Sequence, residues 1–345
     1  MSGIQVKNLY KIFGDNPQDA LKHVMNGVGK AELLDKHGHV LGLQDINIDM
    51  PEGGIQVVMG LSGSGKSTLI RHINRLIEPT SGQMLVDGVD VLGMGKEELR
   101  QFRANKTSMV FQKFALLPHR TVQSNVEYGL EVQGIGASER TERSQKWIDR
   151  VGLKGFEQNY PAQLSGGMQQ RVGLARALAT DAEILLMDEA FSALDPLIRT
   201  DMQDVMLELQ TELKKTIVFI THDLDEALRI GDKIAILRDG GMVQQGNAQD
   251  IILRPADNYI RDFVKDINRA RVLRIDSIMT ESTNDKGPEL PGTMRLDEAT
   301  RTLQEAGAKH AKVMDDSGKQ IGSISLAAMI DSIVEKVELT GDATF

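Results

Sequence analysis

The chain has 345 residues, of which 26% are charged and 41% hydrophobic, with a formal net charge of −9 at pH 7 and no cysteine. This length allows two domains, the acidic balance argues against a general nucleic-acid binder, and the lack of cysteine excludes a disulfide framework. Residues 1–6 lack the basic start and apolar centre of a signal peptide, and no apolar run approaches the ~18 residues of a membrane span. We therefore expect a chain that does not cross a membrane by itself.

Two half-buried strands are predicted near the N-terminus, because hydrophobic and polar residues alternate there. Their hydrophobic positions are Ile4, Val6 and Leu9 in the first strand, and Ile46, Ile48 and Met50 in the second. Residues 15–42 between them are polar and partly helical, with Leu33 and Leu34 as their apolar stripe. We interpret this segment as an insertion, and its sequence does not indicate a purpose.

A buried strand, a glycine-rich loop and a helix come next. The apolar run Ile55–Met59 leads into Gly60–Thr68, which matches the pattern G-x-x-x-x-G-K-[ST] of loops that bind nucleoside triphosphates. Glycine lets backbone N–H groups approach phosphate oxygens, and a helix N-terminus favours an anion. The predicted nucleotide ligands are Gly60, Ser62, Gly63, Ser64, Gly65, Lys66, Ser67 and Thr68. An ordinary glycine-rich turn is the alternative interpretation.

Two side chains of this loop have specific predicted roles. Lys66 would place a compact positive charge on the β- and γ-phosphates. The Ser67 hydroxyl would take one position on a Mg²⁺ ion, which prefers oxygen ligands. The loop therefore predicts a site for ATP with Mg²⁺.

The remaining pattern up to residue 243 alternates strands with helices. Predicted strands are Gln83–Val86, Thr107–Phe111, Ile184–Met187, Ile217–Ile220, Ile234–Leu237 and Met242–Val243, and predicted helical stretches lie at about 121–156, at Val172–Ala179 and at Leu197–Leu213. Continuous apolar strands that alternate with helices indicate an α/β fold whose parallel sheet is covered on both faces. The stretch of about 113–170 is predicted to be a helical subdomain.

An acidic pair follows one of the apolar strands. Asp188 would hold the magnesium shell, and Glu189 would orient and polarise an attacking water as general base. Taken alone, such a pair is usually a solvated strand end. The phosphate-binding loop in the same chain makes the catalytic interpretation the better one.

A serine followed by two glycines opens the helix at Val172–Ala179. Ser165 could simply cap that helix, with Gly166 and Gly167 serving the cap geometry. The alternative is a second anion-binding helix N-terminus that faces a γ-phosphate.

With these motifs in this order, the chain resembles the nucleotide-binding subunit of an ATP-binding-cassette (ABC) transporter from Ile4 to about Val264. The family's further motifs lie at Gln112 (glutamine loop), Leu164–Gln169 (signature), Ser192–Asp195 (aspartate loop) and His222 (switch histidine). The resemblance implies a P-loop ATPase fold with a mostly parallel core sheet, an antiparallel β subdomain and a helical subdomain.

The resemblance also implies a head-to-tail dimer of two copies, with each ATP held between the phosphate loop of one copy and the signature of the other. The implied signature ligands are Ser165, Gly166, Gly167 and Gln169, together with Asp195 of the aspartate loop. Gln112 would sense the magnesium ion and the water. His222 would contact the γ-phosphate and hold Glu189 in register, and Lys66 completes the implied catalytic set.

Phe13 lies where the family has an aromatic residue that stacks on adenine. A phenylalanine that merely packs at the end of a strand is an equally good interpretation.

Three segments, at 74–82, 114–119 and 188–199, resemble importers of glycine betaine, proline betaine and choline. This implies membrane permease subunits docking near Gln112–Thr121, where Phe114–Pro118 is predicted to be exposed and apolar. It also implies a solute-binding protein acting indirectly, and a location at the cytoplasmic face of the cell (inner) membrane. The alternatives are an importer of another small amine or amino acid, a soluble ABC ATPase not coupled to transport, or a regulatory module without catalysis.

A domain boundary is predicted near Asp266, with residues 267–345 forming a linker and a small α+β domain. This tail resembles a single cystathionine-β-synthase-type (CBS) repeat, with Ile278 and Met279 near its start and Gly322–Ser325 near its end. Ala328 replaces the aspartate usual in that family, which puts nucleotide binding by the tail in doubt. A basic cluster at Arg269, Arg271 and Arg274 is better explained as a solvated linker than as a lipid-binding patch.

Overall fold

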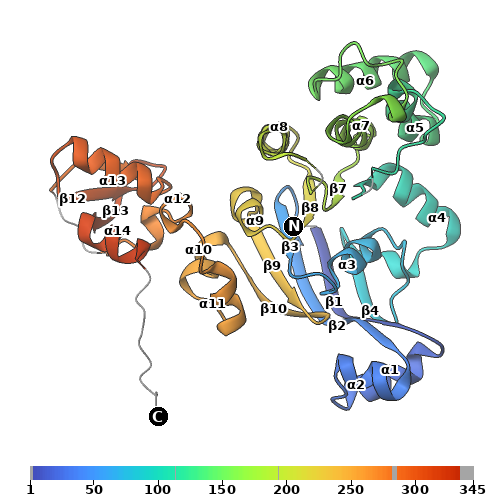
Figure 1. The fold of residues 1–345 in the computed structure, drawn as a ribbon, viewed down its shortest axis with the longest axis horizontal. Coiled ribbons are helices and arrows are strands. Elements are labelled where there is room, and N and C mark those ends of the chain that lie inside the picture. The colour runs from blue at the N-terminus through green and yellow to red at the C-terminus, as the bar shows by residue number, and fades with distance from the viewer. Residues whose placement is uncertain (1–2, 113, 193, 282–285, 335–345) are drawn as a thin grey trace. The chain divides into compact units, whose positions relative to one another are not determined.

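The structure, a computed structural model, describes residues 3–112, 114–192, 194–281 and 286–334 (Figure 1). The chain divides into two compact units, Met1–Gln245 and Gly246–Phe345. Among the described residues the strands form three sheets. The six-stranded core sheet and the four-stranded outer sheet belong to the N-terminal unit, and the three-stranded sheet belongs to the C-terminal unit.

The core sheet of the N-terminal unit has the strand order β10-β9-β3-β8-β7-β6. These strands are β10 (Gly241–Gly246), β9 (Lys233–Arg238), β3 (Ile55–Met59), β8 (Thr216–Thr221), β7 (Ile184–Asp188) and β6 (Thr107–Val110). All pairings from β9 to β6 are parallel. The outer sheet is antiparallel and runs β2 (Val40–Pro51), β1 (Gly3–Phe13), β4 (Ser81–Val86), β5 (Val89–Asp90). The predicted fold class is confirmed.

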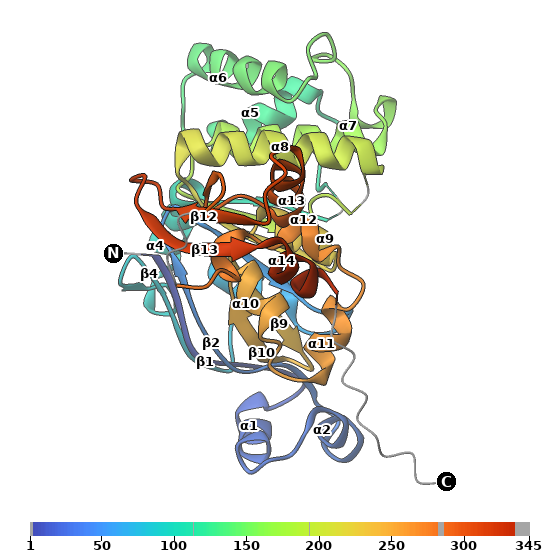
Figure 2. The same cartoon turned by 90° about the vertical axis from the view of Figure 1, so that its left-hand side faces the viewer.

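The helices of this unit connect and cover the strands. They are α1 (Pro17–Met25), α2 (Lys30–His37), α3 (Lys66–Ile73), α4 (Lys96–Gln101), α5 (Val122–Val132), α6 (Ala137–Arg150), α7 (Gly166–Ala179), α8 (Pro196–Leu213) and α9 (Leu224–Ile230), with short helical turns η1 (Val91–Gly93), η2 (Phe102–Lys106) and η3 (Pro161–Gln163). Helices α5, α6 and α7 pack on one another in a helical layer (Figure 2), and α7 also packs against β6. The helical subdomain predicted at about 113–170 covers α5 and α6 but only the start of α7.

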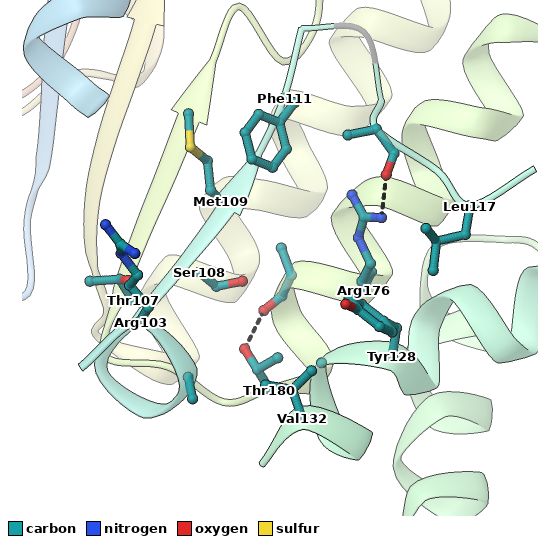
Figure 3. A pocket seen from close by; sticks show the side chains of 14 residues that line it. Arg103, Thr107, Ser108, Met109, Phe111, Leu117, Tyr128, Val132, Arg176 and Thr180 are labelled. Carbon is teal, nitrogen blue, oxygen red and sulfur yellow. Dashed lines mark hydrogen bonds between the residues drawn. The ribbon is translucent and has the colours of Figure 1, made fainter. Parts of the chain in front are cut away.

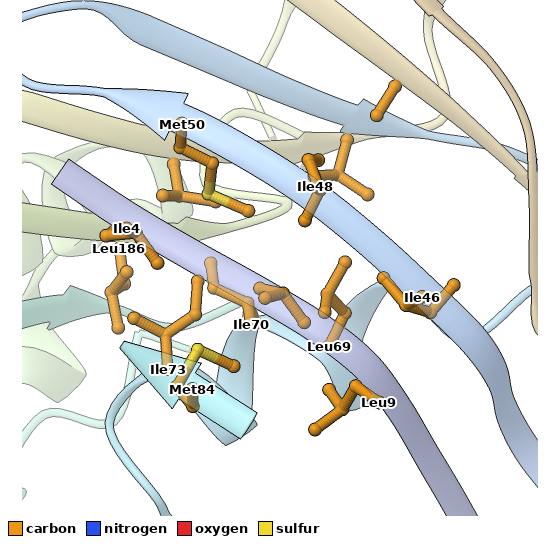
Figure 4. Packing of buried hydrophobic residues seen from close by; sticks show 14 of the residues in the cluster. Ile4, Leu9, Ile46, Ile48, Met50, Leu69, Ile70, Ile73, Met84 and Leu186 are labelled. Atoms are coloured by element: carbon orange, nitrogen blue, oxygen red, sulfur yellow. The ribbon is translucent and has the colours of Figure 1, made fainter. Parts of the chain in front are cut away.

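Helix α3 lies between the two sheets and fixes the end of the glycine-rich loop. Its Leu69, Ile70 and Ile73 are buried against residues of β1, β2 and β4 on one side and of β7 on the other (Figure 4). Strand β3, which leads into the loop, is buried along its whole length. Burying these side chains contributes about 1.5–3 kcal/mol each to the stability of the fold. The loop is therefore held at both ends by firmly packed elements, β3 and α3.

The predicted insertion forms a helical hairpin with a small core of its own. Ala20, Leu21 and Val24 of α1 and Leu33 of α2 pack against Ile12 and Leu41 of the flanking strands. Of the predicted apolar stripe, Leu33 is fully buried in this core, whereas Leu34 is 51% exposed. Neighbouring residues of a helix point about 100° apart, and only one of the two can face this narrow core.

The C-terminal unit contains helices α10 (Ala248–Leu253), α11 (Asn258–Val264), α12 (Arg269–Val272), α13 (Leu296–Glu305) and α14 (Leu326–Ile333), the turn η4 (Ile275–Ser277), and strands β11 (Glu289–Pro291), β12 (His310–Met314) and β13 (Gln320–Ser325). Strand β11 pairs with β12 in parallel, and β12 pairs with β13 antiparallel. Residues 282–285, in and beside the predicted loop at 284–289, and residues 335–345 lie outside the described residues.

The compact units divide before α10, whereas the sequence predicts a boundary near Asp266. The side chain of Gln249 in α10 donates to the carbonyl of Val272 at 3.1 Å and accepts from the N–H of Arg274 at 3.1 Å. These contacts group α10 with the residues that follow it. The ABC-like sequence pattern continues to about Val264, so the functional boundary stays a prediction. None of the helices in the described part of the chain could span a bilayer.

His72 on α3 is fully buried, and its Nδ1 lies 2.6 Å from the carbonyl oxygen of Thr68. Burial lowers the pKa of this imidazole from 6.5 to about 4. The unfolded chain therefore binds more protons than the folded chain between these pH values, and stability falls as the pH falls.

We expect the free energy of unfolding to lose about 3 kcal/mol through His72 between pH 6.5 and 4. His72→Asn keeps a donor for Thr68 but does not titrate in this range, so its stability should depend less on pH than that of the wild type. Denaturant unfolding at several pH values measures this, with the exposed His119 changed to Asn as control. Parallel pH curves for wild type and His72→Asn would contradict the assignment.

Candidate active site

The glycine-rich loop runs from the end of β3 to the start of α3 and lines a cleft of about 570 Å³. The residues that line it are Leu61, Ser62, Gly63, Gly65, Lys66, Ser67, Thr68, Gln112, Glu189 and His222. Two further residues of the loop, Gly60 and Ser64, are buried. Gly60 has φ +147°, and a Cβ there would lie 2.2 Å from the carbonyl oxygen of Leu237, so no other residue fits this turn.

Lys66 is buried at the floor of the cleft, 5% exposed. Its ammonium donates to the carbonyl oxygens of Gly60 at 2.7 Å and Leu61 at 3.0 Å. Burial lowers the pKa of Lys66, and the carboxylates of Glu189 and Asp188 act in the opposite direction. The loop thus holds a poorly hydrated cation, whose interaction with a polyphosphate would be stronger than in water.

Asp188 at the end of β7 is 1% exposed and has two partners on α3. One carboxylate oxygen accepts from the Ser67 hydroxyl at 2.8 Å, and the other accepts from Nη2 of Arg71 at 3.1 Å. The oxygen donors of Ser67 and Asp188 fit the preference of Mg²⁺. The sequence analysis missed Arg71, although Ser67 and Arg71 are four residues apart on one helix and so share a face.

Glu189, Gln112 and His222 come together at the mouth of the cleft. The Nε2 of Gln112 donates to Oε2 of Glu189 at 2.7 Å, and Nδ1 of His222 lies 3.7 Å from the same oxygen. Glu189 has φ +47°, a left-handed conformation that is rare outside glycine, and its N–H donates to the carbonyl of Ile220. Such strain persists where surrounding structure enforces it, and it is typical of functional sites.

The signature residues lie apart from this cleft. Ser165 is the N-cap of α7 and its Oγ accepts from the N–H of Met168 at 3.3 Å, while the Gln169 amide donates to the carbonyls of Pro161 and Leu164. A Cβ added at Gly166 would meet no atom within 4 Å. Ser165, Gly166, Gly167 and Gln169 do not line the cleft around Lys66. Ser165 can therefore serve both as the cap of α7 and as part of an anion-binding helix N-terminus, because its capping bond leaves that N-terminus open.

Arg199, another residue that the sequence analysis missed, bridges the aspartate loop and the switch segment. Its guanidinium donates to the carbonyl of Leu194 at 3.3 Å and to Oδ2 of Asp223, next to His222, at 3.1 Å. Asp195 caps α8 by accepting from the N–H of Ile198 at 3.1 Å. Ala193, in the predicted aspartate loop, lies outside the described residues.

Phe13 ends β1 and is 39% exposed, but it does not line the cleft. The ammonium of Lys11 lies 4.9 Å from the centre of its ring. Gly42 also lies close to the ring, since a Cβ there would lie 2.7 Å from Cε2 of Phe13. Stacking of Phe13 on adenine stays a prediction.

Comparison with known proteins agrees with this geometry. Residues 43–192 match the family model described as ABC transporter. The chain is 47% identical over 333 residues, covering 96% of this chain and 83% of the relative, to the Escherichia coli (strain K12) glycine betaine/proline betaine transport system ATP-binding protein ProV. The chain belongs to the ABC transporter family.

A second relative and a solved structure extend the comparison. The trimethylamine N-oxide transport system ATP-binding protein TmoW of Pelagibacter ubique (strain HTCC1062) is 41% identical, over 96% of this chain and 98% of its own length. The dimeric structure of MJ0796, a bacterial ABC transporter cassette, is similar with a TM-score of 0.62 at 32% identity, covering 71% of this chain and 98% of the cassette.

The predicted family, the ATPase activity and the binding of ATP with its partner ion Mg²⁺ are confirmed by these comparisons. The individual roles of the site residues are not tested by them. The observed convergence of Gln112, Glu189 and His222 on one cleft with Lys66 supports those roles. The CBS-like resemblance of the tail stays a prediction.

We expect Glu189→Gln to bind ATP but to hydrolyse it about 10²–10⁴-fold more slowly, which corresponds to about 3–5 kcal/mol of activation free energy. The amide keeps the shape and can still accept from Gln112, but it cannot take a proton from water. Single-turnover hydrolysis measures the rate. Glu183→Gln, at the opposite end of β7 and 67% exposed, is the matched control and should hydrolyse ATP like the wild type. Rapid hydrolysis by Glu189→Gln would remove Glu189 as general base.

Proposed function

We propose that this protein is the ATP-hydrolysing subunit of an importer for glycine betaine, proline betaine or choline-type compatible solutes. One observation carries the proposal: the similarity to a glycine betaine/proline betaine subunit extends through 96% of the chain. It therefore includes the α1–α2 hairpin and the C-terminal unit as well as the cassette.

The identity of the solute rests on relatives alone, because a cassette subunit does not touch the transported molecule. The relative named for trimethylamine N-oxide makes another small amine the second candidate. A soluble ABC ATPase without a transport role is disfavoured, because the named relatives are subunits of transport systems.

In the proposed mechanism two copies bind head to tail, and each ATP lies between one phosphate loop and the partner's signature. In this chain Ser165 does not line the cleft around Lys66, which supports a site completed by a second copy. Lys66 and the loop N–H groups hold the triphosphate. When bound, Mg²⁺ neutralises developing charge on the phosphates, and Ser67 and Asp188 are the residues placed to hold it.

Glu189 then orients the attacking water and accepts its proton, while Gln112 and His222 keep the carboxylate in place. The hydrogen bond from Gln112 occupies one oxygen of Glu189 and restricts its rotation. Cleavage replaces one bound triphosphate by two separate anions, and their repulsion favours opening of the dimer. The cycle couples ATP hydrolysis to closing and opening of two copies.

A cleft of about 310 Å³ between β6 and helices α5 and α7 is the proposed docking site for a cytoplasmic helix of the permease (Figure 3). Tyr128 and Val132 of α5 are 40% and 47% exposed at this cleft. It adjoins the predicted docking segment Gln112–Thr121, within which Lys113 lies outside the described residues. Within the segment predicted to be exposed and apolar, Ala115 and Pro118 are exposed, whereas Phe114, Leu116 and Leu117 are half-buried. Leu117 lines the cleft together with Tyr128 and Val132 of α5.

Arg176 of α7 connects this cleft to the active site. Its guanidinium donates to the carbonyls of Phe114 at 2.9 Å and Ala115 at 2.7 Å, and both residues have left-handed φ angles of 58° and 47°. The same short segment begins at Gln112, and α7 begins at the signature. A helix inserted in the cleft would therefore act on both nucleotide-binding surfaces.

Together these features support a peripheral subunit that binds the cytoplasmic face of the cell membrane through the permease. A solute-binding protein would act on it indirectly, through the permease. The C-terminal unit would regulate transport as a CBS-like domain. In this unit Ser325 caps α14 by accepting a hydrogen bond from the N–H of Ala328. Arg274 of the basic cluster is paired with Asp276 at 3.3 Å, which favours a structural over a lipid-binding role for Arg274.

We expect the purified complex with its permease, in lipid vesicles, to hydrolyse ATP faster when glycine betaine or a related quaternary amine is supplied. Val132→Glu should abolish that stimulation, because it places a charge in the docking cleft, without reducing the basal hydrolysis of the isolated subunit. Val89→Glu, at a 54% exposed valine of β5, is the control. Equal rates with and without every quaternary amine tested would contradict the proposed substrate class.

Deletion of residues 275–345 should leave ATP hydrolysis intact and change how the vesicle complex responds to ionic strength. The reason is that the phosphate loop, signature and acidic pair all lie in the N-terminal unit. Hydrolysis rates measured across a salt series test this. The same salt response in the deleted and full-length proteins would exclude a regulatory role in salt sensing.

A further inference from the structure

The α1–α2 hairpin, to which the sequence assigns no purpose, contacts the phosphate loop directly. The Nζ of Lys30 donates to the carbonyl oxygen of Gly63 at 2.9 Å, across 33 residues of sequence. Gly63 lines the nucleotide cleft and has φ +77°. The contact therefore acts on the part of the loop whose backbone conformation determines where its N–H groups point.

The hairpin is anchored firmly enough for this contact to have a fixed position. Besides the small core around Leu33, the side chain of Gln18 in α1 donates to the carbonyl of Thr80 at 2.6 Å. His39 closes the base of the hairpin through the carbonyls of Asp15 and His37. Figures 1 and 2 both place α1 and α2 at the end of the N-terminal unit opposite α5 and α6. The hairpin thus supports the phosphate loop from the side away from this chain's own helical layer.

The charge of Lys30 is poorly placed for the helix that carries it. Lys30 is the first residue of α2, where a cation opposes the helix macrodipole. The carboxylate of Glu32 in the same turn pairs with Lys36 at 2.7 Å. Stability of α2 therefore gives no reason for a lysine at position 30, whereas a nearby triphosphate does, because its negative charge attracts the ammonium.

We propose that Lys30 is a positioning residue of the nucleotide site, which holds the Gly63 peptide in its phosphate-binding orientation and adds a positive charge beside the loop. The α1–α2 hairpin is then a part of the ATP site rather than a passive insertion. The ligand class is the nucleoside triphosphate that Gly60–Thr68 binds. The inference rests on that ATP binding and concerns its strength, not the chemical step.

The test is the affinity of the full-length protein for a fluorescent N-methylanthraniloyl ATP, measured at low and at high salt. Lys30→Met should raise the dissociation constant about three- to tenfold at low salt, and less at high salt, where charge is screened. Lys30→Arg should restore affinity to within about twofold of the wild type. For ATP hydrolysis, Lys30→Met should raise KM and leave kcat unchanged, since the reacting groups are untouched.

Lys36→Met is the matched control, because Lys36 lies on the same helix with its side chain 69% exposed and pairs only within α2 in the described contacts. It should bind the nucleotide like the wild type. Wild-type affinity in Lys30→Met would overturn the proposal, as would a lowered Tm with unchanged affinity, which would make Lys30 a brace for the fold alone. If Lys30→Met does not fold, Lys30→Gln takes its place with the same expected loss. If the wild type binds the fluorescent ATP saturably, the assignment of the phosphate loop as an ATP site holds whatever the result for the Lys30 variants.

Discussion

The buried carboxylate of Asp188 is the constraint on which the active site depends. A carboxylate that is 1% exposed requires compensating partners, and both come from one face of α3, as the Ser67 hydroxyl and the Arg71 guanidinium. These bonds fix the end of β7 against the start of α3. They thereby set the distance between the phosphate loop and Glu189, which directly follows Asp188. Gln112 and His222 approach the carboxylate of Glu189 from two other segments.

In the proposed head-to-tail mechanism, each subunit supplies half of a complete nucleotide site. The cleft around Lys66 contains the loop, the acidic pair and the switch histidine, while Ser165 and its glycines open on a separate, exposed helix N-terminus. Both surfaces favour a bound anion for the same reason: each lies at a helix N-terminus, where N–H groups and the positive end of the helix dipole face the ligand. A triphosphate between two copies satisfies both surfaces at once. Arg176 and Arg199 link these surfaces to the docking cleft and to the switch segment within one subunit.

Local sequence patterns predicted most of the fold, because each buried strand and each glycine of the phosphate loop is specified by its own neighbours. Tertiary partners were not predictable in this way. Arg71 and Arg199 carry no motif, and their roles come from which side chains the packing brings near. The purpose of residues 15–42 was equally hidden, since the contact of Lys30 with Gly63 spans elements that no local pattern connects. The half-burial of Phe114 and Leu117 also depends on a backbone turn that composition does not reveal.

The most direct test of the account is whether ATP brings the phosphate loop of one copy against the signature of another. The chain has no cysteine, so single cysteines can be placed cleanly, as Leu61→Cys in the exposed tip of the loop and Ala162→Cys beside the signature, in two differently tagged copies. With a short bismaleimide, the account predicts a cross-linked product containing one copy of each, formed with ATP and not without it. Failure of that product to form while both copies bind ATP would contradict the account.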